Sequence, residues 1–177
     1  KAQYDYLVEY ENVDIRVVGI ANSKKMFFDE AGIDLDNWKA ELDSKGESMQ
    51  ADAFVQKMSD VNLRNSIFVD NTANYDIAGL YEGILRKSIS VVTPNKIACA
   101  SEYDNYLKLK AIAKEYKSKF YYETNVGAGL PVITTLGDLI KSGDKITKIQ
   151  AVLSGSLNFI FNTFKPGVKF ADVVRQA

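Results

Sequence analysis

The sequence predicts an α/β fold, a doubly wound, Rossmann-like parallel sheet. Apolar runs rich in β-branched residues recur along the chain, and segments with the apolar spacing of helices separate them. Short polar or glycine-containing turns follow the runs. Because strands that alternate with helices form right-handed βαβ units, we expect a parallel sheet whose carboxyl edge binds the ligand.

The first third of the chain is predicted to contain one buried strand and short helices. Residues 6–10 have the apolar spacing of the end of a helix. Residues 14–20, "DIRVVGI", form a continuous apolar run, which is typical of a strand buried in a parallel sheet. Apolar spacing then predicts helices over residues 36–42, with Asp36 as a candidate N-cap, and over residues 51–58.

From residue 66 onward the alternation becomes regular. Buried strands are predicted over residues 66–70, 88–93 and 119–123, because each is a short apolar run bounded by polar residues. Helices are predicted over residues 75–87 and 102–117, because their apolar residues fall on one helical face. This order of elements carries most of the fold prediction.

The last part of the chain changes character. After Pro131, which suits a first helical turn, a helix is predicted as far as Lys141, with Gly143 as its stop. Residues 145–161 alternate apolar and polar side chains before a glycine-containing turn, so they could begin a second domain with a sheet of its own. A helix is expected to start at Phe170.

Composition excludes several classes of function. The chain has 177 residues, 46% of them hydrophobic, and a net charge of −1 without a long block of either sign, so we expect neither a nucleic-acid nor a membrane partner. With no histidine and only Cys99, a Ser-His-Asp triad and a histidine zinc site are excluded. No run approaches a membrane span and no signal-peptide pattern is present. We therefore expect a small-molecule substrate and a cytoplasmic protein.

The stretch "ANSKK" follows the first predicted strand. An NAD-specific fold usually has an acidic residue at the end of its second strand to bind the ribose 2′-hydroxyl. Here Asn22, Ser23, Lys24 and Lys25 stand there instead, and they suit a 2′-phosphate better, so a bound cofactor would be NADP rather than NAD. The alternative is a solvated polar turn.

Two further strand ends carry candidate site residues. In "DNTANYD", Asp70, Asn71, Thr72, Ala73 and Asn74 could line a nicotinamide or ribose, although such residues also serve as turns and helix caps. In "TPNKIA", Pro94 fixes the turn and Lys96 could deliver a proton to an aldehyde or polarise its carbonyl. The alternative for Lys96 is an ordinary surface lysine.

The stretch "ETNVGAGLPVI" contains a G-x-G, but it does not fit a pyrophosphate loop. That loop needs a third small residue and follows the first strand, whereas this stretch has Val132 at the third position and follows the last predicted strand. What remains is a Gly-Ala-Gly turn whose carbonyl groups could coordinate a hard cation beside Glu123. A tight strand-to-helix turn is equally compatible with these residues.

Taken together, "FVDNTANYD", "VVTPNKIA", "YETNVGAGLPVI" and "VLSGSLNFIFN" resemble homoserine dehydrogenases, in the same order and with similar spacing. "ANSKK" and "GIDLDNWKAEL" look especially like the dehydrogenase half of bifunctional aspartokinase–homoserine dehydrogenases, which implies a possible kinase fusion. The resemblance implies reversible hydride transfer between NAD(P)H and L-aspartate 4-semialdehyde, giving L-homoserine for threonine, methionine and isoleucine biosynthesis. It also implies a homo-oligomer formed through the second domain.

The resemblance also implies the site residues. Lys96 matches the family's lysine at the boundary between cofactor and substrate. The other matches are the cofactor side of the crevice (Thr72, Ala73, Asn74), the position that meets the adenosine ribose or its phosphate (Ser23, Lys24), the loop that reaches the substrate (Gly155, Ser156) and a sodium-type cation site, largely of main-chain oxygens (Glu123, Val126, Ala128, Leu130).

The chain departs from the family pattern at both ends. The family's first strand and Gly-rich loop would precede Lys1, and its substrate-binding carboxylates and second catalytic lysine would follow Ala177. We therefore expect residues 1–125 to be an N-terminally truncated NAD(P)-binding domain and residues 126–177 the start of the catalytic domain. We expect this piece alone to bind cofactor weakly and to have little or no activity.

Two other functions remain open from the sequence. Another aldehyde-acting Rossmann dehydrogenase of the phosphorylating type would need a cysteine nucleophile, and Cys99 is the only candidate, without a histidine partner. A non-catalytic nucleotide-binding or regulatory domain could have the same alternation of strands and helices, because fold does not imply function.

Overall fold

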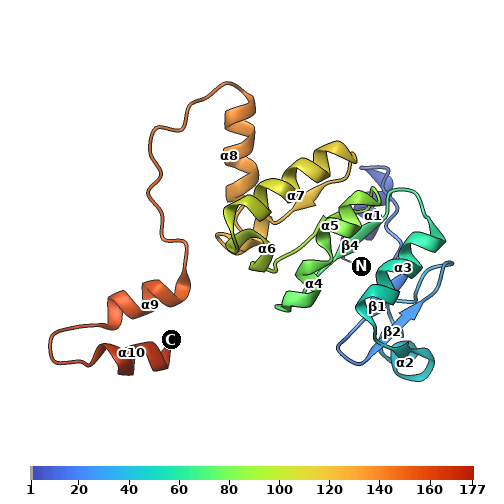
Figure 1. Cartoon of the computed structure of the whole chain (residues 1–177), viewed down its shortest axis with the longest axis horizontal. Coiled ribbons are helices and arrows are strands. Elements are labelled where there is room, and N and C mark those ends of the chain that lie inside the picture. Colours follow the sequence, from blue (N-terminus) through green and yellow to red (C-terminus); the bar gives the residue numbers. More distant parts are fainter. Residues whose placement is uncertain (1) are drawn as a thin grey trace.

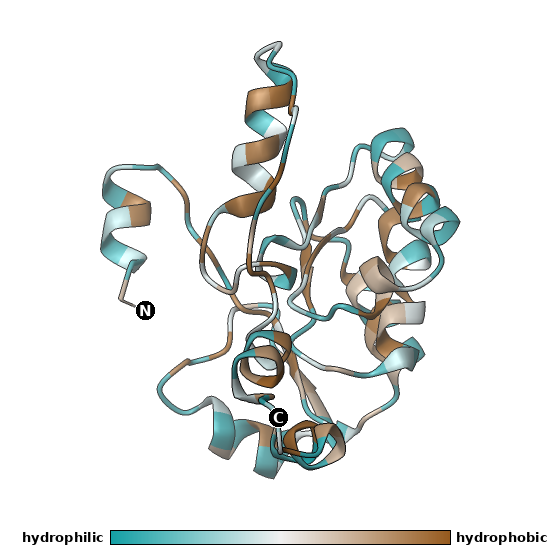
Figure 2. Cartoon of the chain, turned by 90° about the vertical axis from the view of Figure 1, so that its left-hand side faces the viewer, coloured by the Kyte–Doolittle hydropathy of each residue, from teal (hydrophilic) through white to brown (hydrophobic). Residues whose placement is uncertain are grey.

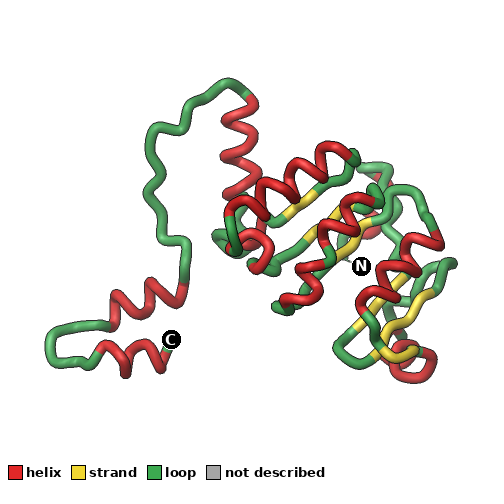
Figure 3. The backbone as a smooth tube through the Cα atoms, viewed as in Figure 1, coloured by secondary structure: helices red, strands yellow, loops and turns green. Residues whose placement is uncertain are grey.

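The computed structural model describes residues 2–177 and contains two small sheets with helices around them (Figure 1, Figure 3). The antiparallel sheet has the order β1 (Gly19–Ala21), β2 (Lys25–Phe28) and β3 (Glu47–Ser48). The parallel sheet has the order β4 (Ile67–Val69), β5 (Ser90–Val92) and β6 (Phe120–Tyr121). The helices are α1 (Tyr4–Glu9), α2 (Trp38–Lys45), α3 (Ala51–Val61), α4 (Tyr75–Gly79), α5 (Tyr81–Arg86), α6 (Ile97–Ala100), α7 (Tyr103–Glu115), α8 (Val132–Lys141), α9 (Gly155–Thr163) and α10 (Phe170–Gln176), with a 3-10 turn η1 (Glu123–Asn125).

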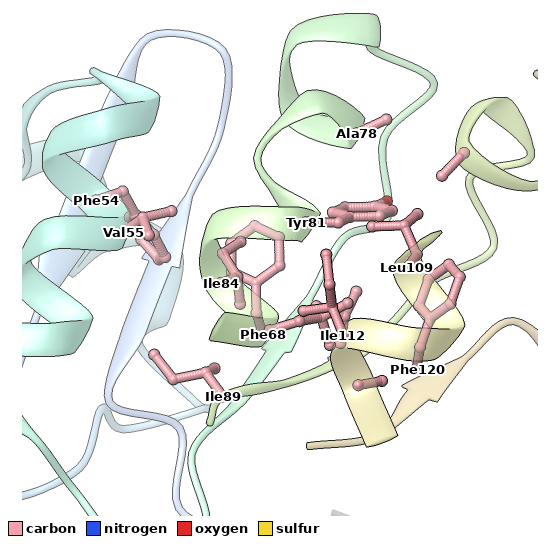
Figure 4. Packing of buried hydrophobic residues seen from close by; sticks show 14 of the residues in the cluster. Phe54, Val55, Phe68, Ala78, Tyr81, Ile84, Ile89, Leu109, Ile112 and Phe120 are labelled. Atoms are coloured by element: carbon pink, nitrogen blue, oxygen red, sulfur yellow. The ribbon is translucent and has the colours of Figure 1, made fainter. Parts of the chain in front are cut away.

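The core lies on one face of the parallel sheet. The strand register aligns Phe68, Val91 and Phe120 in one row, and all three are buried. Helices α5 and α7 pack against each other over this row (Figure 4). Their buried side chains are Tyr81, Ile84, Leu85, Leu109, Ile112 and Ala113. Apolar burial of this kind is the main favourable term for the fold.

The opposite face of the parallel sheet is open in the part of the chain that the structure describes. Ile67, Val69 and Tyr121 are 56%, 55% and 54% exposed. Helix α3 instead links the two sheets, because its Phe54 packs on Phe28 of β2, with ring centroids 4.6 Å apart, and faces Phe68 of β4 edge-on at 6.2 Å. The α/β class and the parallel sheet are confirmed.

The predicted strand over residues 14–20 is wrong in its extent and its pairing. Only residues 19–21 form a strand, and β1 pairs antiparallel with β2 in the smaller sheet. The cause is local: the Asn22 side-chain oxygen accepts hydrogen bonds of 2.8 Å from the backbone N–H groups of both Lys24 and Lys25, which closes the hairpin turn between β1 and β2. An apolar run predicts burial but does not specify which strand it pairs with.

The predicted helices of the middle region are present with modified ends. The helix expected over residues 75–87 is divided into α4 and α5 at Leu80, just after Gly79, a poor helix former. The helix expected over residues 102–117 is α7, and a short helix, α6, precedes it without having been predicted. The helices predicted over residues 36–42 and 51–58 correspond to α2 and α3.

The C-terminal region forms an arm that projects from the body (Figure 1). Helix α8 ends before Gly143, whose φ is +96°, as predicted. Residues 145–153 contain no helix or strand and are all exposed, and α9 follows, with the Ser154 side chain capping the Leu157 N–H at 3.2 Å. The sheet expected over residues 145–161 is therefore not found, because an alternating pattern becomes a strand only beside a pairing partner.

The arm is rich in exposed apolar side chains. Figure 2 shows hydrophobic residues on helix α8, where Leu139 is 39% and Ile140 59% exposed. Helices α9 and α10 contact each other, the rings of Phe164 and Phe170 lie 5.3 Å apart, and Val173 is buried. No described helix is long and apolar enough to cross a membrane.

Candidate functional site

Three polar loops meet at the carboxyl edge of the parallel sheet. They follow β4, β5 and β6, and side chains join them directly: the Asn95 amide donates to Asp70 Oδ2 at 3.0 Å, and the Asn125 amide donates to the carbonyl oxygens of Pro94 and Thr93 at 3.0 and 3.2 Å. Ligands bind at this edge in open α/β sheets. The edge is therefore the candidate site.

A buried polar network lies beneath these loops. The Asp70 carboxylate is 2% exposed and accepts hydrogen bonds from the Tyr81 hydroxyl at 2.5 Å and from the Thr72 N–H at 2.7 Å. The Tyr81 hydroxyl also lies 2.9 Å from Thr93 Oγ1. Thr93 in turn donates to the Asp70 carbonyl oxygen at 2.9 Å and accepts from the Asn95 N–H at 2.8 Å. Every member is hydrogen-bonded, as buried polar groups must be.

The network keeps a carboxylate charged inside the protein. Burial alone raises the pKa of Asp70, but the hydrogen bonds from Tyr81, Thr72 and Asn95 more than offset it, so its pKa lies below the ordinary 3.8. Burial and the neighbouring Asp70 both raise the pKa of Tyr81. At neutral pH the pair is therefore an aspartate that accepts and a tyrosine that donates.

The structure brings Thr72, Ala73, Asn74 and Lys96 to this edge, as the sequence predicts. All four are exposed. The Asn74 side-chain oxygen caps α4, accepting from the N–H groups of Asp76 and Ile77 at 2.7 and 3.1 Å, so its helix-cap role is established in the structure. The carbonyl of Lys96 starts α6 by accepting from the Cys99 and Ala100 N–H groups, and the lysine side chain is exposed.

The turn after β6 is built around Glu123. Its carboxylate accepts hydrogen bonds of 2.8 Å from the Ile133 and Thr134 N–H groups, and another from the Thr134 hydroxyl. It therefore caps the N-terminus of α8. The Thr134 hydrogen bond is the main reason why the pKa of Glu123 lies below its ordinary value.

The same turn contains the candidate cation ligands. Gly127 and Ala128 have left-handed backbone conformations, with φ of +73° and +51°. The carbonyl oxygens of Val126 and Ala128 accept no hydrogen bond from residues 2–177, whereas that of Leu130 accepts one from Val132 at 2.9 Å. Main-chain oxygens fit a hard cation, but the Glu123 carboxylate is already used as a helix cap. Among the described residues, no cluster of acidic and cysteine side chains could hold a metal.

The remaining predicted residues lie elsewhere. Ser23 and Lys24 form the exposed tip of the β1–β2 hairpin, in the antiparallel sheet. Gly155 and Ser156 begin α9 on the projecting arm, apart from the loops that carry Lys96 (Figure 1). The predicted residues that follow β4, β5 and β6 therefore lie together at the sheet edge, and Ser23, Lys24, Gly155 and Ser156 lie away from it.

Sequence reasoning missed the network. Tyr81 has the spacing of an apolar helix stripe, and nothing in that pattern shows that its hydroxyl meets Asp70. Asn95, between Pro94 and Lys96 in "TPNK", was the available signal, because a buried asparagine in a turn usually hydrogen-bonds to backbone.

Cys99 lies in α6, just after the turn that carries Lys96, and burial raises the pKa of its thiol to about 11. That pKa disfavours the thiolate a cysteine nucleophile needs.

Most of the chain is similar in sequence to one family of known proteins. The profile described as "Homoserine dehydrogenase, NAD binding domain" matches residues 3–123, and the profile described as "Homoserine dehydrogenase" matches residues 131–177. The bifunctional aspartokinase/homoserine dehydrogenase 1, chloroplastic, of Zea mays is 42% identical over 178 residues, covering 100% of this chain and 19% of the relative. The homoserine dehydrogenase of Emericella nidulans is 49% identical over 117 residues, or 63% of this chain and 32% of the relative.

A solved structure shares the fold. A hyperthermophilic archaeal homoserine dehydrogenase mutant in complex with NADPH superposes with a TM-score of 0.71 at 24% identity, covering 99% of this chain and 56% of the other. The chain spans about a fifth of the length of the bifunctional maize relative and about a third of the fungal one.

Proposed function

Because the chain belongs to the homoserine dehydrogenase family, we propose that the protein reduces L-aspartate 4-semialdehyde to L-homoserine, and catalyses the reverse oxidation, with a nicotinamide cofactor. A hydride adds to the aldehyde carbon, the C=O π bond opens, and a proton completes the hydroxyl. The observation that carries the proposal is Lys96, exposed on a turn that Asp70 and Asn95 tie to the neighbouring loop at the ligand-binding edge.

Lys96 is the residue proposed to act on the substrate oxygen. When bound, the reduced nicotinamide supplies the hydride. The Lys96 ammonium would donate a hydrogen bond to the aldehyde oxygen, which gains negative charge as the hydride arrives, so the interaction strengthens toward the transition state. Thr72, Ala73 and Asn74 would line the cofactor side of the same crevice.

Several finer assignments complete the proposal. NADP is preferred over NAD because Ser23 and Lys24 offer a hydroxyl and a cation to a 2′-phosphate. A sodium-type cation would be held by the main-chain oxygens of Val126 and Ala128, with Glu123 and Leu130 in the same turn. Gly155 and Ser156 contact substrate, which requires the arm to approach the edge.

The domain division and the assembly are likewise proposals. Residues 1–125 form the cofactor domain and residues 126–177 belong to the catalytic domain, supported by the two separate family profiles over residues 3–123 and 131–177. The whole protein carries a fused aspartokinase, as the name of the maize relative suggests. Its homo-oligomeric state is proposed from the family resemblance alone. It acts in the cytoplasm.

Replacing Lys96 tests the reaction. Lys96→Ala in the whole protein should lower kcat for NADPH oxidation with aspartate semialdehyde by about 100-fold or more, because a proton-handling or oxyanion-stabilising group is lost. Lys114→Ala, an exposed lysine on α7, is the matched control and should leave kcat near wild type. Equal kcat in Lys96→Ala and wild type would show that Lys96 does not act on the substrate, whereas no turnover by the wild-type protein would favour the non-catalytic nucleotide-binding alternative.

Replacing Lys24 tests the cofactor preference. Lys24→Ala should raise KM for NADPH about 10-fold and leave KM for NADH nearly unchanged, since only NADPH carries the 2′-phosphate that a lysine would pair with. Lys39→Ala, on α2 and likewise exposed, serves as the control. A parallel loss for both cofactors would show that Lys24 does not read the phosphate.

A further inference from the structure

We propose that Asp70 is a positioning residue for Lys96: its buried carboxylate fixes the turn that carries the lysine against the loop that follows β4. The inference rests on the proposed function only in taking Lys96 as the reacting residue. Its structural part, that one carboxylate holds two site loops in register, stands independently of the reaction.

The burial of the network is the first observation. Asp70 is 2%, Thr93 2%, Asn95 3% and Tyr81 0% exposed. A charged carboxylate at such a place is costly unless hydrogen bonds satisfy it. The hydrogen-bond partners of Asp70 therefore indicate what its carboxylate does.

Those partners come from three different segments. Asp70 Oδ1 accepts the Thr72 N–H of its own loop, and Oδ2 accepts both the Tyr81 hydroxyl of α5 and the Asn95 amide of the next loop. The Asp70 backbone takes part as well, because its carbonyl accepts the Thr93 hydroxyl. The carboxylate therefore connects the loop after β4, the loop after β5 and the helix beneath them.

Asn95 transmits this connection to Lys96. The same amide group that donates to Asp70 also donates to the Asn74 carbonyl oxygen at 3.2 Å, and the Asn95 side-chain oxygen accepts the Ile97 N–H at 3.1 Å. Lys96 thus stands between two residues whose positions this single side chain fixes. Its own exposed side chain is not part of the network, so Asp70 acts on it through the Asn95 side chain and the backbone of the turn.

Asp70→Asn removes the feature that the network requires. Three donors converge on the carboxylate, from Thr72, Tyr81 and Asn95, and an amide offers one oxygen and an NH2 group in place of two oxygens. One donor must then face another donor, so at least one hydrogen bond is lost. The expected result is a loosened turn, and small misplacement of a reacting group is enough to slow catalysis.

The experiment compares Asp70→Asn with Asp104→Asn, an exposed aspartate on α7, in the whole protein. Hydrogen–deuterium exchange of residues 71–75 and 93–97 should accelerate at least 10-fold in Asp70→Asn and stay unchanged in Asp104→Asn. Unchanged exchange in Asp70→Asn overturns the inference whatever the activity. This readout also separates it from the proposed function, because it needs no turnover.

Kinetics test the link to Lys96. Asp70→Asn should lower kcat about 10-fold with a smaller change in KM for NADPH, and this loss should vanish in a Lys96→Ala background. An equal loss in both backgrounds would mean that Asp70 does not act through Lys96 and would overturn the inference.

A second pair of variants covers the case in which Asp70→Asn does not fold. Thr93→Val removes the hydroxyl that contacts Tyr81, the Asp70 carbonyl and the Asn95 N–H, whereas Thr93→Ser keeps it. Faster exchange at residues 93–97 and lower kcat in Thr93→Val than in Thr93→Ser support the inference. Equal exchange and equal kcat in the two variants overturn it.

Discussion

Glu123 illustrates at the scale of one residue how a capping carboxylate makes a helix depend on pH. Its folded-state pKa lies below the ordinary 4.5, chiefly because of the Thr134 hydrogen bond. A depressed carboxyl pKa contributes stability that is fully present above the unfolded-state pKa and is lost as the pH falls through the folded-state pKa. The start of α8 should therefore loosen in acid.

Glu123→Gln should abolish that pH dependence. At pH 7 we expect lower protection factors for the Ile133 and Thr134 amides in the variant, because a neutral amide is a weaker cap than a carboxylate at a helix N-terminus. The difference from wild type should shrink below about pH 4.5, the ordinary pKa of this carboxyl group. Amide exchange by NMR, corrected for intrinsic rates, measures it.

The control for this prediction is Asp138→Asn, an exposed carboxylate later in α8 that pairs with Lys141. Such a surface pair contributes little, so Ile133 and Thr134 should keep wild-type protection. Equal protection in Glu123→Gln and wild type at pH 7 would contradict the capping role.

Single residues of the site were predictable where the local pattern determines their place. Lys96 lies in "TPNK", the loop that follows β5, so its position at the sheet edge follows from the order of elements alone. Asp70, Tyr81 and Asn95 meet across 11 and 25 positions of sequence, and no local periodicity encodes such a meeting. Ser23 was misplaced for a different reason: it was assigned to a parallel strand end, whereas the Asn22 turn puts it on a hairpin.

At the scale of elements, the turn between β6 and α8 depends on one glycine more than on the other. Gly127 has φ +73°, and a Cβ there would lie 2.8 Å from Val132 Cγ2. At Gly129 a Cβ would meet nothing within 4 Å. The two glycines of the G-x-G therefore have different structural roles.

Gly127→Ala should destabilise the fold by about 1–2 kcal/mol, the usual cost of a side chain in the left-handed region, with the Val132 contact adding to it. Gly129→Ala is the matched control and should change stability little. Urea unfolding of the two variants and wild type measures the difference. Equal stability of the two variants would mean that the turn adapts without cost.

Elements with strong periodicity were predicted well, and those that depend on distant partners were not. Helices α3, α7 and α8 and strands β4, β5 and β6 lie where apolar spacing puts them. Residues 14–20 and 145–161 have equally clear patterns, yet a strand forms only where another strand supplies hydrogen bonds. Part of the first run forms a strand of the β1–β2 hairpin, and no strand among residues 2–177 pairs with the second run.

At the scale of the whole molecule, large apolar side chains are exposed in several places, two of which follow from the fold described above. One is the open face of the parallel sheet, with Ile67, Val69 and Tyr121 more than half exposed. The other is the arm, where Val152 is 75% and Phe161 68% exposed. Contiguous apolar surface of this kind usually marks a place where protein packs on protein.

Residues 145–153, the segment without helix or strand, should make the molecule separable by brief proteolysis. Proteases need a locally unfolded backbone of several residues, so trypsin should cut after Lys145 and Lys148 well before it cuts after Lys110 and Lys114, which are also exposed but lie within α7. Mass spectrometry of a time course would identify the first fragments. Early cleavage within α7 would contradict this expectation. A stable fragment ending near residue 145 would contain the candidate site without the arm, and its cofactor binding could be measured separately.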